Sequence, residues 1–67
     1  MTFGERLYQI RTDKGIKASF LARKMDCSEQ AIYRYEEGNR LPPLKKFGKL
    51  CKVLKITPSE FLEGVEL

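Results

Sequence analysis

The chain of 67 residues is long enough for one small domain, and a domain of about 60 residues buries only about 60% of its unfolded surface. Thirteen Lys and Arg against nine Asp and Glu give a net charge of +4, which permits polyanion binding without establishing it. An apolar content of 42% excludes a disordered chain, and the lack of any apolar run of about 18 residues excludes a spanning helix. The N-terminus has no signal-peptide pattern, so we expect a cytoplasmic protein.

Cys27 and Cys51 are the only cysteines, and the chain has no histidine. Zinc sites use three or four Cys, His or carboxylate ligands at short spacings, which are missing, so we expect no metal and no cofactor. Both cysteines fall at apolar positions of helical patterns, where we expect them to pack in the core. The chain also lacks a glycine-rich phosphate loop and a nucleophile–base pair, so we do not expect an enzyme.

The first predicted helix begins after Thr2, which forms a capping-box pattern with Glu5, and it runs to about Lys14. Gly15 follows as a left-handed stop. Three apolar residues recur at helical spacing on one face of this segment: Phe3, Leu7 and Ile10.

Two short helices joined by a tight turn are predicted for residues 18–25 and 29–36. Ser28 is a good N-cap for the second of these, and Gly38 lies just past its end. The apolar residues of the pair are placed to pack against each other: Leu21, Ala22, Met25, Cys27, Ile32 and Tyr35. This packing leaves the second helix with a polar outer face, and the major groove of DNA admits one such helix.

A loop over residues 38–43 leads to a fourth helix, for which Pro43 suits the first position. One face of this helix is apolar, with Leu44, Phe47, Leu50, Cys51 and Leu54. A fifth helix opens with the capping sequence Thr57-Pro58-Ser59-Glu60 and directs Phe61 and Leu62 inward. Because there is no strand alternation, repeat or linker, we expect an all-α fold of five short helices in one domain, residues 1–67.

The chain resembles the lambda-repressor-like helix-turn-helix domains of phage repressors, Cro proteins and xenobiotic-response-element-type bacterial regulators, over about residues 3–62. The joint order and spacing of the matching pieces are specific: Ile10-Arg11, Lys14-Gly15, Leu21-Ala22, Ser28 with Ile32, residues 34–40 with Pro42, Phe47, Leu50, Leu54, Ile56 and Phe61-Leu62. The resemblance implies the compact five-helix fold of that family, with its helix-turn-helix at about residues 18–37.

By this resemblance, positions that face bases in the family fall on four residues of the third helix: Glu29, Gln30, Tyr33 and Arg34. Gln can pair with an adenine edge and Arg with guanine. Tyr33 suits a thymine methyl or a phosphate, and Glu29 either accepts from a cytosine amino group or complements the helix dipole. The alternative interpretation is that all four form an ordinary solvated helix face.

Phosphate contacts are expected from the start of the second helix and from the loop into the fourth: Asn39, Arg40, Lys45 and Lys46, with Lys17, Arg23 and Ser28. Lys52 and Lys55, near the far end of the fourth helix, are better interpreted as a solvated face. Arg11 and Glu36 match positions that form a buried ion pair in some members of the family.

The chain departs from the family pattern at three places. Lys17 and Ala18 stand where the family often has Ser or Thr followed by a phosphate-contacting Gln, so neither that cap nor that contact is available. Asp26 replaces the turn glycine, and Asp tolerates the left-handed region. Phe20 occupies a commonly polar position; we expect it in the core, with an exposed contact for another chain as the alternative.

The resemblance implies a sequence-specific regulator of transcription that binds double-stranded DNA, a repressor acting as a homodimer on a near-palindromic operator. Candidate dimer contacts are Leu62, Val65 and Leu67. The alternative for Val65 and Leu67 is that they simply fray at the end of the chain. Two alternatives stay open. One is an antitoxin-type autoregulator, and the other is a protein-interaction module that has kept the fold without binding DNA.

Overall fold

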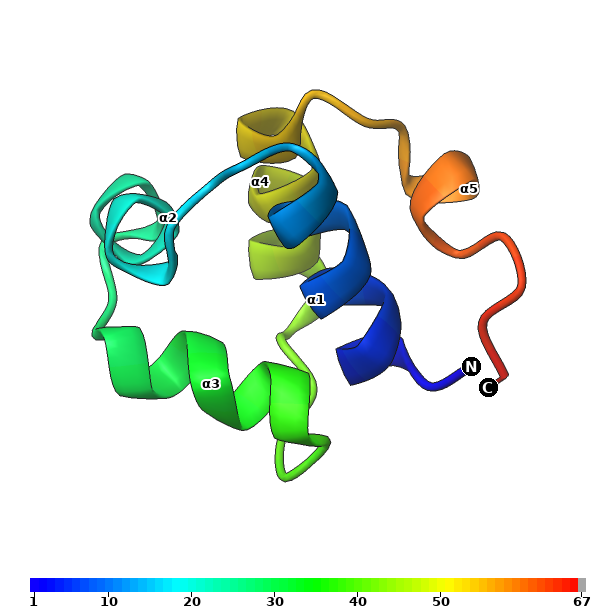
Figure 1. The fold of residues 1–67 in the computed structure, drawn as a ribbon, viewed down its shortest axis with the longest axis horizontal. Coiled ribbons are helices and arrows are strands. Elements are labelled where there is room, and N and C mark those ends of the chain that lie inside the picture. The colour runs from blue at the N-terminus through cyan, green and yellow to red at the C-terminus, as the bar shows by residue number, and fades with distance from the viewer. Residues whose placement is uncertain (67) are drawn as a thin grey trace.

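The computed structural model describes residues 1–66, which form five helices and no strand: α1 (Phe3–Asp13), α2 (Ala18–Met25), α3 (Glu29–Glu37), α4 (Leu44–Leu54) and α5 (Pro58–Phe61). The all-α prediction is therefore confirmed, with helix ends displaced by one residue at Asp13, Glu37 and Leu44. In Figure 1, α2 and α3 lie on one side of α1 and α4, and α5 lies on the other side. No helix of the described residues is long and apolar enough to cross a bilayer.

Side-chain caps fix the starts of three helices. The Thr2 hydroxyl accepts from the Glu5 N–H at 3.1 Å, while the Glu5 carboxylate accepts from the Thr2 N–H at 2.8 Å. These bonds lower the pKa of Glu5, so the capping box stabilises α1 at neutral pH and weakens as the pH falls through that lowered pKa. Thr57 and Glu60 repeat the capping box at α5, and the Ser28 hydroxyl caps α3. As expected from its sequence, α2 has no side-chain cap at Lys17.

The core is a single cluster to which every helix contributes. Its largest fully buried side chains are Leu7, Leu21, Ile32, Leu50, Leu54 and Phe61. The rings of Phe3, Phe47 and Phe61 pack together with centroids 4.9 to 5.7 Å apart, which joins α1, α4 and α5. Arg6 donates to the carbonyl oxygens of Glu60 and Phe61, each at 2.8 Å, and so ties the end of α5 to α1.

The prediction that Phe20 lies in the core is wrong, and Leu44 on the apolar face of α4 is not covered. Phe20 is 39% exposed, because it lies on the face of α2 that points away from the buried Ala22 and Met25. Leu44 is 85% exposed, because it occupies the first turn of α4, before the stretch of that helix that the rest of the domain covers. Cys51 is buried as expected, whereas Cys27 is half-buried and packs against the edge of the cluster.

Gly4 allows α1 and α3 to approach within backbone contact. A Cβ atom at this position would lie 2.2 Å from the Glu36 carbonyl oxygen and 2.6 Å from that of Tyr35. We therefore expect Gly4→Ala to lower the free energy of unfolding by about 1–3 kcal/mol, since two helices must move apart. The matched control is Gly48→Ala, where a Cβ meets no atom within 4 Å and alanine should stabilise the helix by about 0.5–1 kcal/mol.

Urea denaturation of both variants measures this difference. Unfolding of Gly4→Ala at the same urea concentration as the parent would contradict the close approach of α1 and α3.

Candidate nucleic-acid interface

Packing and an N-cap fix the position of α3, the helix whose outer face is predicted to contact bases. Ile32 and Tyr35 are buried against the core, and the Ser28 hydroxyl accepts the Ala31 N–H at 3.1 Å. The turn before α3 passes through Asp26, which adopts the left-handed conformation at φ 59°, as the sequence predicts for the residue replacing glycine. The packing and the cap therefore fix α3 on its inner side and leave its outer side free.

The outer side of α3 is polar and contains a shallow hollow. The predicted base-facing residues Glu29, Gln30, Tyr33 and Arg34 are all exposed. The hollow has a volume of about 290 Å³ and is lined by Gln30, Tyr33, Arg34, Glu37 and Asn39. Glu37 is the member that sequence reasoning missed, although its spacing of seven residues from Gln30 places it on the same helix face.

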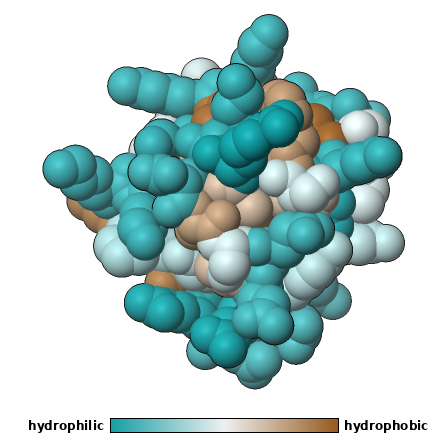
Figure 2. Space-filling model, turned by 90° about the vertical axis from the view of Figure 1, so that its left-hand side faces the viewer, coloured by the Kyte–Doolittle hydropathy of each residue, from teal (hydrophilic) through white to brown (hydrophobic). Residues whose placement is uncertain are grey.

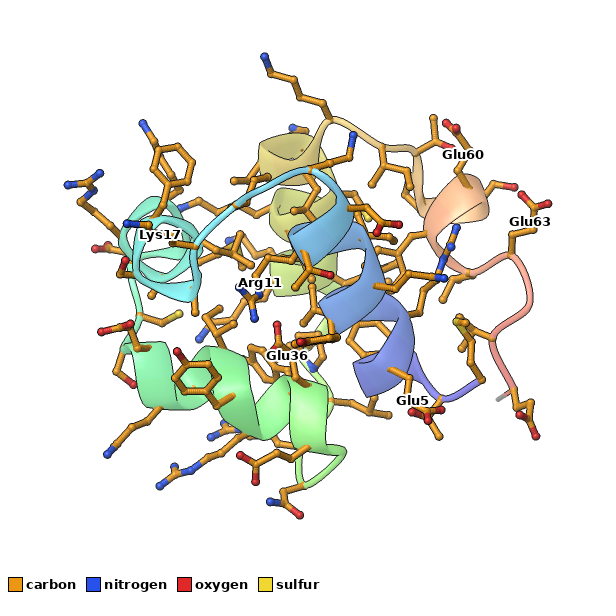
Figure 3. All side chains as sticks on the ribbon, in the orientation of Figure 1. Glu5, Arg11, Lys17, Glu36, Glu60 and Glu63 are labelled. Atoms are coloured by element: carbon orange, nitrogen blue, oxygen red, sulfur yellow. The ribbon has the colours of Figure 1, made fainter. Side chains whose placement is uncertain are left out.

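The expected ion pair between Arg11 and Glu36 is present and holds α3 against α1. Arg11 Nε donates to Glu36 Oε2 at 2.6 Å and Nη2 donates to Oε1 at 3.1 Å, a bidentate arrangement. Arg11 Nη1 also donates to the Ile16 carbonyl oxygen at 3.0 Å, so the same side chain fixes the segment before α2. The bond to Glu36 raises the pKa of Arg11. Figure 3 shows the two side chains pointing toward each other between α1 and α3.

The residues expected to contact phosphates are exposed, and Arg23 among them lies in the last turn of α2. Lys17 and Ser28 directly precede α2 and α3, Asn39 and Arg40 follow α3, and two lysines occupy the first turn of α4. Figure 2, which views the side of the molecule that carries α2 and α3, shows hydrophilic side chains projecting across most of that face. The exposed surface around α3 thus carries positive charge and hydrogen-bond donors from three consecutive helices and their loops.

Two of the candidate dimer contacts, Leu62 and Val65, follow α5, on the side of the domain away from α3. Leu62 and Val65 are half-buried and pack against the core cluster, and Leu67 lies outside the described residues. Glu66 donates its N–H to the Met1 carbonyl oxygen at 2.9 Å, which brings the two ends of the described chain side by side, as Figure 1 shows. Among residues 1–66, the most exposed large apolar side chains are Leu41 and Leu44, both near the start of α4.

Sequence comparison relates this geometry to known proteins. The helix-turn-helix family model matches residues 7–61. The transcriptional activator BcrR of Enterococcus faecalis is 34% identical over 67 residues, which is 100% of this chain and 33% of that protein. The SPbeta prophage-derived transcriptional regulator YonR of Bacillus subtilis is 36% identical over 62 residues, 92% of this chain and 57% of that protein. The chain thus spans less than two thirds of the length of both relatives.

Two solved structures share the fold over most of their length. The restriction-modification controller protein C.AhdI of Aeromonas hydrophila superposes with a TM-score of 0.82 and 34% identity, covering 88% of this chain and 89% of that one. The biofilm regulator SinR, solved in complex with DNA, superposes with a TM-score of 0.80 and 26% identity, covering 91% and 98%. The chain therefore belongs to the lambda-repressor-like helix-turn-helix family of DNA-binding transcription regulators.

Proposed function

We propose that this protein is a sequence-specific transcription regulator that inserts α3 into the major groove of double-stranded DNA. The observation that carries the proposal is the division of α3 into two sides. Its inner side is fixed by Ile32, Tyr35 and the ion pair of Glu36, while its outer side presents side-chain donors and acceptors to solvent. A rigid helix with a free polar face is what base readout in the major groove requires.

Gln30 and Arg34 are the proposed base readers, because their side chains can make two hydrogen bonds each to adenine and guanine. Both line the hollow on α3, and Tyr33 lines the same hollow and is available for an apolar or phosphate contact. Glu29, in the first turn, either reads a cytosine or complements the helix dipole. The phosphate contacts proposed around these readers are Lys17, Arg23, Ser28, Asn39, Arg40, Lys45 and Lys46.

The proposed working form is a homodimer on a near-palindromic operator, where it represses transcription by occluding a promoter. The domain has a longest extent of 27 Å, which is less than the roughly 34 Å between half-sites one helical turn apart. Two copies therefore fit side by side on one face of the duplex. Leu62, Val65 and Leu67 stay the proposed contacts between the copies. We place this non-enzymatic activity in the cytoplasm.

Selection of bound sequences from a random duplex pool tests the proposal. We expect enrichment of an approximate palindrome, whose spacing reports the arrangement of the two copies. Absence of any enrichment at low salt would contradict DNA recognition and would favour the protein-interaction module. Transcription from a template that carries the recovered sequence then distinguishes repression from activation. Activation is the alternative to test because the relative from Enterococcus faecalis is named a transcriptional activator.

Arg34→Ala should relax the preference at a single base pair, losing about 1–3 kcal/mol of discrimination there. The matched control is Lys46→Ala, which should weaken binding to all sequences alike and reduce the salt slope by about 1 for each bound copy. Competition binding with duplexes substituted one base pair at a time measures both effects. A uniform loss of affinity for Arg34→Ala would assign that residue to a phosphate instead.

A further inference from the structure

Gly48 is an unexplained residue in the middle of α4. Glycine weakens a helix interior relative to alanine, and it also lets another molecule approach the backbone closely. A Cβ at Gly48 would meet no atom of the described chain within 4 Å, so the space beside the α4 backbone is open there. Gly4 differs from Gly48, because a side chain at Gly4 would collide with the backbone of α3. Gly48 therefore leaves the backbone of α4 accessible to a close contact from outside the domain.

Three lysines surround Gly48. Lys45, Lys49 and Lys52 stand at helical spacing on one face of α4, and together with Gly48 they line a groove of about 470 Å³. We call these three residues the lysine column. Among residues 1–66 the ion pairs are Met1 with Glu66 and Arg11 with Glu36, so no lysine of the column is paired there. Like charges at this spacing repel each other, and a polyanion would relieve that repulsion.

We propose that the lysine column binds the phosphate backbone of DNA that flanks the recognised site, with a sugar-phosphate strand brought close to α4 at Gly48. This inference rests on the proposed function and extends it. The column starts at Lys45, in the first turn of α4, where phosphate contacts to the site itself are proposed. From there it continues away from the loop that follows α3, as the course of α4 in Figure 1 shows.

The dimensions favour a nucleic acid over an acidic protein. Seven residues of helix separate Lys45 from Lys52, a distance of about 10.5 Å. One strand of duplex DNA presents a phosphate about every 3.4 Å along the axis, so the column is as long as about three phosphate steps. Because the column leads away from α3, the flanking duplex has to bend toward the protein to follow it.

The test compares two duplexes that carry the sequence recovered by selection. The short duplex ends at the site, and the long duplex extends it by about ten base pairs, one helical turn, on each side. We expect the parent protein to bind the long duplex more tightly. The slope of log affinity against log salt should also be steeper on the long duplex, by about 4 for the homodimer, because each of the two domains adds two phosphate contacts.

The double variant Lys49→Gln/Lys52→Gln should lose this extra slope on the long duplex and bind the short duplex as the parent does. The control Lys14→Gln/Lys55→Gln removes the same charge from the loops after α1 and α4, which lie opposite α3 in Figure 1. This control variant should still bind the long duplex more tightly, and with a steeper salt slope, than the short duplex. An equal loss on both duplexes, or no loss on either, would overturn the proposal; no loss would leave an acidic protein as the partner of the groove.

Gly48→Ala gives a second test in which stability and binding change in opposite directions. We expect the melting temperature to rise by about 4 °C, because alanine is the better helix former and the site is open. Affinity for the long duplex should fall while affinity for the short duplex stays unchanged. A stabilised variant that binds the long duplex as the parent does would refute the close approach. Failure of the parent to bind either duplex would instead refute the proposed function itself.

Discussion

Replacing Arg11 with alanine should lower the free energy of unfolding by about 3–5 kcal/mol. The Glu36 side chain is only 8% exposed, and without its bidentate partner it would remain as a buried, uncompensated charge. The Arg11 hydrogen bond to the Ile16 carbonyl oxygen would be lost as well. Because a domain of this size has a total stability of about 3–10 kcal/mol, much of the Arg11→Ala protein should be unfolded at 25 °C.

Urea denaturation followed by circular dichroism measures the loss. The control is the double variant Arg11→Met/Glu36→Leu, which removes both charges and fills the same space with apolar side chains. Replacing a buried ion pair in this way is often neutral or stabilising, so the double variant should recover most of the stability. If Arg11→Ala instead melted like the parent and lost only DNA binding, the structural role of the pair would be disproved.

Phe61→Ala should have an effect of similar size, about 3–5 kcal/mol. Phe61 is fully buried, with its ring centroid 4.9 Å from that of Phe3 and 5.2 Å from that of Phe47. Truncation would leave a cavity where α1, α4 and α5 meet. Arg6 still binds the carbonyl oxygens at the end of α5, but a backbone clamp does not fill that cavity.

Thermal and urea unfolding of Phe61→Ala measure the cost. Leu44→Ala is the matched control, since it also removes a large apolar side chain, but one that is exposed and in the first turn of its helix. It should change the stability by less than about 0.5 kcal/mol. Equal losses in the two variants would show that the aromatic cluster is not a main source of stability.

The sequence is most informative where a local interaction determines the structure. Thr2 with Glu5 and Thr57 with Glu60 are pairs three residues apart, and both form the predicted capping boxes. The stop at Gly15 and the left-handed Asp26 follow from backbone preferences of single residues. The ion pair of Arg11 with Glu36 spans 25 residues, and only the resemblance to a known family identified it.

Sequence reasoning fails where burial depends on which part of a helix its neighbours cover. The spacing of Leu44 and Phe47 predicts a common apolar face, but only the later residue is partly covered. Phe20 is an apolar residue on the outward face of α2. The helix has only eight residues, so the apolar periodicity of the sequence hardly determines which face of α2 points to the core. The contact at Gly4 is missed for another reason: nothing in the sequence around a glycine states which distant backbone it faces.

The backbone contact at Gly4 has a consequence for how the binding preference of this protein can diversify. α3 is positioned by a glycine, two backbone carbonyl groups, the buried Ile32 and Tyr35, and the carboxylate of Glu36. None of these groups belongs to the exposed side chains proposed to read bases. Duplicated copies of the gene could therefore exchange Gln30 or Arg34 and acquire new operators one substitution at a time, without passing through unstable intermediates.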